Sequence, residues 1–345
     1  MPTKVTIQDI ADSLGLSRTT VSKVLNHSTA VSEATRTLVL NKARELNYRM
    51  LPTTPRTPAP VAAEQEMNYF ALVMRTVPSS FHMGTAVIFS LDQKMRQAGY
   101  SMITCAITNE EYKTMTLPHI LTSPQIKAIV CIELFSPEYS QLLSSLGKPM
   151  IFIDACVGFQ SMGLNADLLL MDSRNSVNRM LNTLIHNHKI STMGFVGDVD
   201  HCTSFRERYE AFLLSAKEHG VDTSLSILDD DCHYSEPDWL SKRLAKLKNL
   251  PRLFFCANDY LAGQVMYTLE SMGKRIPEDV MVCGFDGQPT MEYVFSRMTT
   301  VITPSEQIGA YAATLLLHKL QFGSSTNVSS YVNTKIVFRN SAPEF

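Results

Sequence analysis

The chain has 345 residues, of which 45% are hydrophobic and 19% charged, and its formal net charge is −2. This length predicts two or three domains, and the composition is ordinary for a globular protein with a large core. No apolar run approaches the roughly 18 residues that span a bilayer, and no basic-then-apolar signal region opens the chain, so we expect a cytoplasmic protein. Seven scattered cysteines without a Cys-x-x-Cys pair predict reduced and mostly buried thiols.

Charge is divided unevenly along the chain. Residues 1–56 hold eight basic and four acidic side chains, a net charge of +4, which leaves −6 for the remainder. A small basic segment ahead of an acidic body favours nucleic-acid binding through that segment.

Three short helices are predicted within residues 1–50. Thr6 caps the first helix, with Asp9 three positions later, and Gly15 provides the turn because a positive φ costs glycine least. Ser17 caps the second helix, and Ser32 begins the third. Apolar residues with helical spacing should form a common core: Ile7, Ile10, Ala11, Leu14, Val21, Val24, Leu25, Leu38, Ala43 and Leu46.

Two helices joined by a tight turn place the second helix in the DNA major groove, where its first side chains meet base edges. Arg18, Thr19 and Lys23 occupy that leading face, and their donors and methyl group suit base reading. Residues near the helix N-termini are expected to contact phosphate: Thr6, Ser17, Ser22 and Asn26. The alternative is a three-helix scaffold with merely solvated arginines.

Residues 51–67 contain four prolines and predict an extended, semi-rigid linker. From Tyr69 onward, apolar strand-like runs alternate with helical patterns. This βαβ rhythm, with strands buried on both faces, predicts parallel sheets covered by helices. The segment is too long for one such sheet, so we expect two similar lobes.

Polar side chains end several of the predicted strands. Asp172 follows "LLLM", Asn258 follows "LFFCA", Asp286 follows "MVCGF", and Arg208 lies in "SFRERY". Ligands usually bind at the carboxyl ends of parallel strands, and these groups suit a polyhydroxylated ligand. Plainer interpretations remain open: helix caps for Asp172 and Asn258, a turn residue for Asp286, and a surface salt bridge for Arg208.

Further candidates for ligand contact are Ser79, Phe81 and Phe205, although core packing is the alternative for the two phenylalanines. No phosphate-cradling glycine motif and no nucleophile elbow is present. The His201-Cys202 and Cys232-His233 pairs fit no zinc spacing. We therefore predict no enzymatic activity, no metal and no cofactor.

The motifs "TIQDIADSLGLSRTTVSKVLN" and "LNY" in the head, with "SFRERYEAF", "FFCANDYLA" and "IPEDVMVCGFDG" in the body, resemble the lactose-repressor/galactose-repressor (LacI/GalR) family. The resemblance implies a helix-turn-helix head in residues 1–50 and an α/β body of two Rossmann-like lobes, as in type I periplasmic binding proteins. The first lobe is expected to comprise residues 68–165 and 298–328, and the second residues 166–297 and 329–345.

Function follows from the same resemblance. It implies a repressor of a sugar-utilisation operon that binds a pseudo-palindromic operator as a homodimer. A sugar or sugar phosphate between the lobes would contact Asp172, Arg208, Asn258 and Asp286. A soluble sugar-binding protein without a transcriptional role is the competing interpretation. The family's minor-groove hinge helix is not expected here, because prolines interrupt residues 51–67. No leucine heptad follows the body, which favours a dimer over a tetramer.

Overall fold

The computed structural model describes residues 5–25, 31–46, 48, 68–75, 84–234, 236, 238–287, 296–323 and 326–345. The chain forms two compact units, Met1–Gln65 and Glu66–Phe345. The predictions for Asn26, Ser79, Phe81 and the linker in residues 51–67 lie outside the described residues. Within the described ranges, no helix combines the length and the apolar character needed to cross a membrane.

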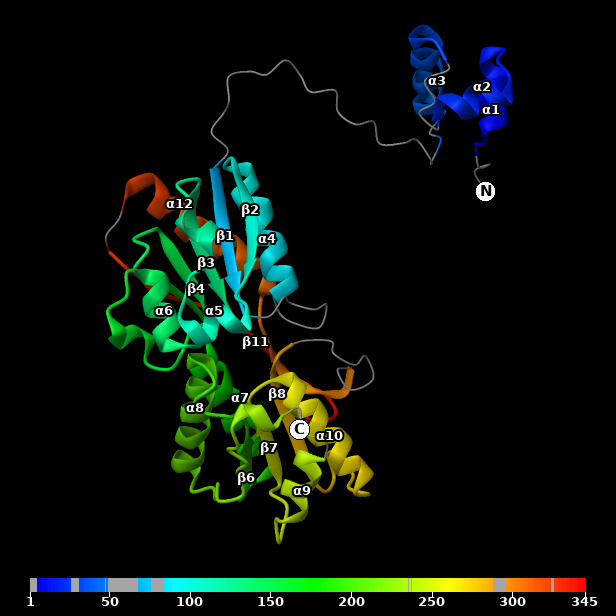
Figure 1. Cartoon of the computed structure of the whole chain (residues 1–345). Helices are drawn as coiled ribbons and strands as arrows, with labels where there is room; N and C mark the ends of the chain where they lie inside the picture. Colours follow the sequence, from blue (N-terminus) through cyan, green and yellow to red (C-terminus); the bar gives the residue numbers. More distant parts are fainter. Residues whose placement is uncertain are drawn as a thin grey trace. The chain divides into compact units, whose positions relative to one another are not determined.

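The first unit contains the three predicted helices, α1 (Ile7–Leu14), α2 (Arg18–Leu25) and α3 (Glu33–Glu45) (Figure 1). Thr6 and Asp9 form the predicted capping box, in which Asp9 Oδ2 accepts a hydrogen bond of 2.7 Å from the Thr6 amide. Gly15 ends α1 with a φ of 63°. Ser17 Oγ accepts a bond of 3.1 Å from the Thr20 amide and so caps α2.

One predicted core residue of the head is wrong. Leu38 is 58% exposed, whereas its neighbour Val39 is fully buried. Three consecutive apolar residues, Leu38 to Leu40, leave the helical phase ambiguous in the sequence, and packing against α1 and α2 selects Val39. The remaining buried core of the head is Ile10, Ala11, Val21, Val24, Leu25 and Ala43.

The second unit holds two sheets. We call the part around the first sheet lobe 1; all its strand pairs are parallel, in the order β10-β5-β4-β3-β1-β2. Its strands are β1 (Asn68–Met74), β2 (Tyr100–Ala106), β3 (Ile126–Ile132), β4 (Met150–Ile153), β5 (Asp167–Met171) and β10 (Ser329–Val332). Helices α4 (Gly84–Gln97) and α12 (Ser305–Phe322) pack on one face. The other face is covered by α6 (Pro137–Ser144), η1 (His119–Thr122) and η2 (Phe159–Met162), and α5 (Asn109–Thr114) follows β2.

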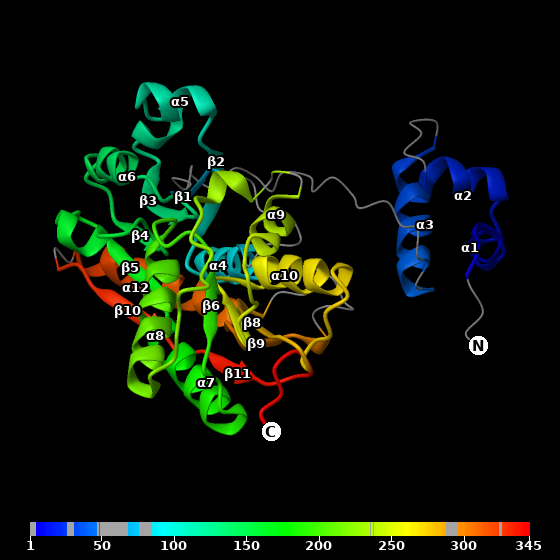
Figure 2. The ribbon, with the colours of Figure 1, turned by 90° about the horizontal axis from the view of Figure 1, so that it is seen from below.

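Lobe 2 surrounds the second sheet, whose order is β11-β9-β8-β7-β6. Its strands are β6 (Met193–Val196), β7 (Leu253–Cys256), β8 (Met281–Asp286), β9 (Thr299–Ile302) and the antiparallel β11 (Lys335–Val337). Helices α7 (Ser173–His188) and α8 (Thr203–His219) lie on one side of this sheet, and α9 (Trp239–Ala245) and α10 (Asp259–Ser271) lie on the other (Figures 1 and 2). The short η3 (Asp231–His233) precedes α9.

The two-lobed architecture is as predicted, but the predicted lobe boundaries misplace three strands. β5 and β10 belong to the first sheet, because β10 pairs with β5 in parallel along its edge. β9 belongs to the second sheet, where it pairs with β8. The chain therefore passes between the lobes after β5, after β9 and after β10, and each crossing follows the end of a strand.

Candidate functional site

In the head, α2 separates its polar side chains from the core. Arg18, Thr19 and Lys23 are exposed, whereas Val21 and Val24 of the same helix are buried. The three exposed side chains have the donors that base edges in the major groove require. This is the placement that the base-reading prediction needs.

The predicted phosphate contacts coincide with helix caps. The Thr6 hydroxyl donates to Asp9 Oδ2 at 2.7 Å, and Ser17 Oγ shares a hydrogen bond of 2.8 Å with Thr20 Oγ1. Ser22 is half-buried. Helix N-termini bind anions through their free amides, so capping and phosphate contact are compatible, and the phosphate roles stay predictions.

In the body, Arg208 of α8 is a buried guanidinium and not a surface residue. Its side chain is 2% exposed. Nη1 donates to Ala257 O at 2.6 Å, and Nη2 donates to Asp286 Oδ1 at 3.1 Å. Its Cζ lies 3.7 Å from the centre of the Phe285 ring. Arg208 Nε has no acceptor among the described residues, so one buried donor of this group remains available.

Asp286 ends β8 with a φ of 112°, in the left-handed region that non-glycine residues rarely adopt. Burial raises the pKa of its carboxyl to about 6, against the lowering influence of Arg208. The charges of Asp154 and Glu133 raise this pKa further. Asp154 and Glu133 belong to lobe 1, so the pKa of Asp286 in lobe 2 depends on groups of both lobes.

Asn258 and Asp172 both cap helices. Asn258 Oδ1 accepts a bond of 2.9 Å from the Leu261 amide at the start of α10. Asp172 Oδ1 accepts a bond of 3.1 Å from the Asn175 amide at the start of α7. Asn258 directly follows the carbonyl that accepts from Arg208, whereas Asp172 lies at an interlobe crossing, where its amide donates to Val332 O. A ligand role in addition to the cap stays a prediction for both.

Phe205 lies between the core and the polar cluster. Its ring centre is 5.5 Å from Arg208 Cζ and 4.8 Å from the His201 ring. The His201 ring also lies 4.8 Å from the ring of Phe135 of lobe 1, in an edge-on arrangement. Aromatic side chains thus continue from lobe 2 to lobe 1 beside Arg208.

Sequence reasoning missed Asp154, which joins the lobes directly. It follows β4, and its Oδ1 accepts a bond of 3.3 Å from the Ser204 amide at the N-terminus of α8. The next amide toward the N-terminus, that of Thr203, donates to Ala155 O at 2.8 Å. The N-cap residue Cys202 provides no side-chain bond, so a carboxylate of lobe 1 satisfies the positive end of this lobe 2 helix. The signal was present, because "MIFID" ends on an aspartate as "MVCGFD" does.

Glu133, which follows β3, was also missed. It has a φ of 52°. Because β3 and β4 are parallel neighbours, Glu133 and Asp154 follow the strands at the same end of the first sheet. The two residues thus follow the carboxyl ends of the neighbouring strands β3 and β4.

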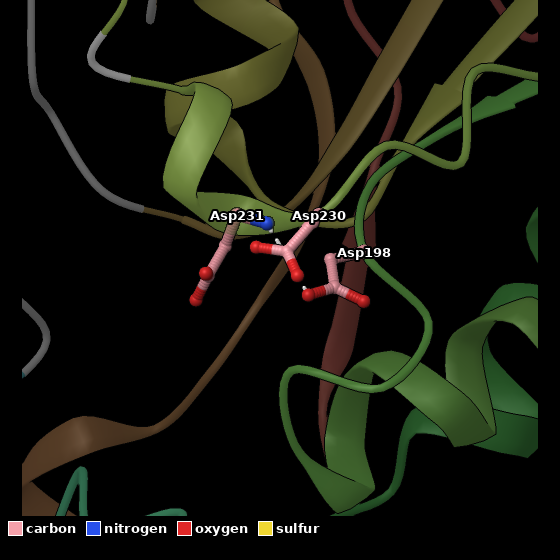
Figure 3. A group of neighbouring side chains, drawn as sticks. All are labelled: Asp198, Asp230 and Asp231. Carbon is pink, nitrogen blue, oxygen red and sulfur yellow. Dashed lines mark hydrogen bonds between the residues drawn. The ribbon is translucent and has the colours of Figure 1, made fainter.

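A second group of acidic residues lies in lobe 2, after β6 and at the start of η3. One carboxylate oxygen from each of Asp198, Asp230 and Asp231 lies within 4.8 Å of the others (Figure 3). Asp230 Oδ1 accepts from the Cys232 amide at 2.9 Å, and Asp198 Oδ2 accepts from the Asp231 amide at 3.3 Å. His201 Nδ1 lies 2.6 Å from Asp231 Oδ2. Backbone amides and an imidazole account for these contacts, so we assign no metal here.

Both parts of the chain match known families. Residues 6–50 match the bacterial regulatory proteins of the lacI family, and residues 183–342 match the periplasmic binding protein-like domain. The chain thus joins a lacI-family DNA-binding domain to a periplasmic-binding-protein-like domain. This combination makes it a DNA-binding transcriptional regulator and not an enzyme.

Relatives of this regulator match along nearly its whole length. The transcriptional repressor PurR of Pasteurella multocida is 26% identical over 342 residues, which cover 97% of this chain and 98% of PurR. The ribose operon repressor of Halalkalibacterium halodurans is 25% identical over 337 residues, covering 97% and 96%.

Solved structures share the fold. The lac repressor dimer bound to operator and the anti-inducer ONPF superposes with a TM-score of 0.67 at 18% identity, over 99% of this chain and all of that one. The complex of the transcriptional regulator CelR with cellobiose has the same TM-score and identity, over 98% and 99%.

Proposed function

We propose that this regulator is a repressor that works in the cytoplasm, binds a pseudo-palindromic operator as a homodimer and is controlled by a small polyhydroxylated effector held between its lobes. The observation that carries the proposal is the interlobe cluster of Arg208, Asp286 and Asp154 in a chain whose head exposes Arg18 and Lys23. PurR and the ribose operon repressor are named as repressors, which supports the sign of regulation.

The DNA contact is tested at Arg18. Operator sequences are first selected from random duplexes with the full-length protein. Arg18→Ala should then weaken binding to the selected DNA by about 1–3 kcal/mol and relax its sequence preference. Arg96→Ala is the matched control, because Arg96 is an exposed arginine of α4 in the other unit. Equal losses in both variants would reject the assignment of α2 as the reading helix.

Salt dependence separates this function from its competitor. A regulator that neutralises phosphates loses affinity by orders of magnitude between about 50 and 200 mM salt. A sugar-binding protein without a transcriptional role would bind no DNA in either buffer.

A second copy of the chain fits one side of the body. Phe89 of α4 and Tyr260 and Tyr267 of α10 are 70%, 50% and 71% exposed. Both helices lie along the same side of this unit in the two views (Figures 1 and 2). Exposed aromatic side chains are typical anchors of protein interfaces, and the lac repressor of similar fold is a dimer.

Sedimentation measures this assembly. Tyr267→Glu should shift the protein toward monomer, because a twofold interface places the change in both subunits. Leu214→Glu serves as the control, since Leu214 is a half-exposed apolar residue on α8, across the sheet. If Tyr267→Glu remains dimeric and Leu214→Glu does not, the interface is on the other side.

Effector control follows from the contacts between the lobes. Asp154, Ala155 and Cys156 of lobe 1 receive hydrogen bonds from Thr203 and Ser204 of lobe 2. A ligand that binds one lobe arrangement better than another shifts the population toward it, and thereby changes DNA affinity. Arg208→Ala should abolish the effector response with operator binding retained. Retention of that response would refute the site.

A further inference from the structure

Glu207 of α8 is a buried carboxylate between the lobes. Its side chain is 3% exposed. Its Oε1 accepts a hydrogen bond of 2.8 Å from the hydroxyl of Tyr331 in β10, and Arg174 Nη1 of α7 donates to the same atom at 2.9 Å. One carboxylate oxygen of α8 therefore binds two other elements, one in each lobe.

Both partners of Glu207 lie next to places where the chain passes between the lobes. Arg174 is in the first turn of α7, which begins directly after the crossing that follows β5. Tyr331 lies in β10, just before the crossing that follows this strand. The two crossings are joined to each other, since the Thr334 hydroxyl donates to Asp172 O at 3.0 Å. Glu207 thus fastens this pair of crossings, the hinge, to α8.

The surroundings of Glu207 favour the binding of a proton. Arg174 Nη2 also lies 2.5 Å from Glu210 Oε2, so one guanidinium serves two carboxylates. Burial raises the pKa of the Glu207 carboxyl, and the charges of Asp154 and Glu210 raise it further. The Tyr331 hydroxyl and the Arg174 charge act in the opposite direction. Glu207 Oε2 is buried and has no hydrogen-bond partner among the described residues, which makes it the atom for the proton.

A proton on Glu207 would weaken its hold on the hinge. Hydrogen bonds to an ionised acceptor are roughly twice as strong as those between neutral groups, so the bonds from Tyr331 and Arg174 both lose strength. Arg174 keeps Glu210 as an ion-pair partner, and its charge stays compensated. The helix that carries Arg208 is then held less firmly to the crossings.

We propose that Glu207 is a positioning residue of the hinge: its negative charge holds α8 to the interlobe crossings, and one bound proton releases them and shifts the lobe arrangement. Operator affinity then depends on pH through this residue. The proposal rests on the proposed function, since it requires that the lobe arrangement controls DNA affinity. It adds a proton to the effector as a second input.

The test compares Glu207→Gln with the wild type in operator binding, without any effector. Glutamine keeps the size of glutamate and is uncharged, like the protonated carboxyl. Both full-length proteins are titrated onto duplexes selected from random DNA, by fluorescence anisotropy between pH 8.0 and 5.0 at constant ionic strength. Their Kd values should differ by about fivefold or more at pH 8.0 and should converge as pH falls toward 5.0. A Kd ratio that is the same across this range overturns the proposal.

Glu210→Gln is the matched control. Glu210 pairs with the same guanidinium from a half-exposed position, and its removal leaves the bond between Tyr331 and Glu207 in place. The ratio of its Kd to that of the wild type should therefore be the same at both ends of the pH range. If Glu210→Gln converges with the wild type as Glu207→Gln does, the effect is a general one of charge and the proposal is overturned.

Urea unfolding tests the hinge bond without DNA, with the fluorescence of Trp239 in the core of lobe 2 as the signal. Tyr331→Phe removes the interlobe bond but keeps the Glu207 charge. It should lower the urea midpoint more at pH 8.0 than at pH 5.0, and this difference should vanish when Glu207→Gln is also present. An equal loss at both pH values shows that the bond does not depend on the charge, which overturns the proposal.

The two levels of failure give different results. A full-length protein that selects no duplex from random DNA overturns the proposed function. A protein that binds its selected operator with a pH dependence unaltered by Glu207→Gln overturns only the role of Glu207, and the proposed function stands.

Discussion

Replacing Arg208 with methionine should destabilise lobe 2 in a pH-dependent way. The Arg208 side chain is 2% exposed and that of Asp286 is 19% exposed, so methionine keeps the packing volume but leaves a carboxylate without its cation. Breaking a buried pair by removing one partner costs about 3–5 kcal/mol. We expect a loss near the lower end of this range at pH 7.5, because Asp286 retains some contact with solvent.

The pH dependence follows from the titration of Asp286. Its folded-state pKa is raised from 3.8 to about 6, mainly by burial. A raised carboxyl pKa means that folding favours the protonated form of Asp286. The stability that this preference contributes is fully present below pH 3.8 and is lost as pH rises through 6. Without Arg208 the pKa rises further, which adds to the penalty at pH 7.5. At pH 5 Asp286 is largely protonated in both proteins, so the stability difference should shrink.

Trp239 provides the assay. It is the single tryptophan of the chain, and it lies 7% exposed in the core of lobe 2. Urea unfolding followed by its fluorescence reports the free energy of this lobe. Asp286→Asn combined with Arg208→Met should recover much of the loss at pH 7.5, since the uncompensated charge is gone. Arg252→Met is the control. The Arg252 guanidinium donates to a backbone carbonyl, Pro277 O, whereas Arg208 also pairs with a carboxylate. An equal loss at both pH values, or no recovery in the double variant, refutes the reasoning.

Three further substitutions test the packing between elements. Lys319→Met should cost about 3–5 kcal/mol, because Lys319 Nζ lies 2.7 Å from Asp167 Oδ1 and both side chains are nearly buried. Adding Asp167→Leu should recover most of that loss in urea unfolding followed by circular dichroism. Gly309→Ala should lower the melting temperature, since the added Cβ would lie 2.0 Å from a carbonyl oxygen of α4; an unchanged melting temperature would contradict this close approach. Tyr331→Phe should cost about 0.5–1.5 kcal/mol, because it removes the interlobe bond of 2.8 Å to Glu207; no loss in urea would show that the bond is not stabilising.

Local signals were sufficient for the head. The capping box at Thr6, the turn at Gly15 and the cap at Ser17 all depend on residues within four positions of each other, and the structure contains all three. The prediction that Leu38 is buried was wrong for a complementary reason. Within a run of apolar residues, only contacts with other helices decide which side chain is buried, and those contacts are not local.

The predicted lobe boundaries were wrong because strand pairing is not a local property. The run "LLLMD" predicts a buried strand, but its sequence does not say which sheet it joins. β5 is tied to lobe 1 by β10, whose Ser329 pairs with Leu168 from a distant part of the chain. Likewise, the sequence predicted that Arg208 and Asp286 contribute to one ligand site, but it did not predict the direct hydrogen bond between them.

Asp154 was missed because its role depends on the other lobe. In the sequence it is one more polar residue after a strand, whereas in the fold it occupies the N-terminus of a helix 50 positions away. Helix caps are usually sought among the residues just before the helix. Here Cys202 is at that position and provides no side-chain hydrogen bond. A helix start without a capping residue was therefore the signal that its partner comes from another part of the chain.

α8 therefore connects three parts of the regulator. The Ser204 amide in its first turn donates to Asp154 of lobe 1. Its buried Glu207 accepts a hydrogen bond from the Tyr331 hydroxyl of β10, and its Arg208 pairs with Asp286 at the end of β8 in lobe 2. A rigid helix cannot lose one of these contacts without straining the others, and packed elements of this kind move between discrete arrangements. An effector that bonds to Arg208 and to the carboxylates of lobe 1 would act on the same helix from both sides. Opening and closing of the lobes should for this reason be a concerted two-state change.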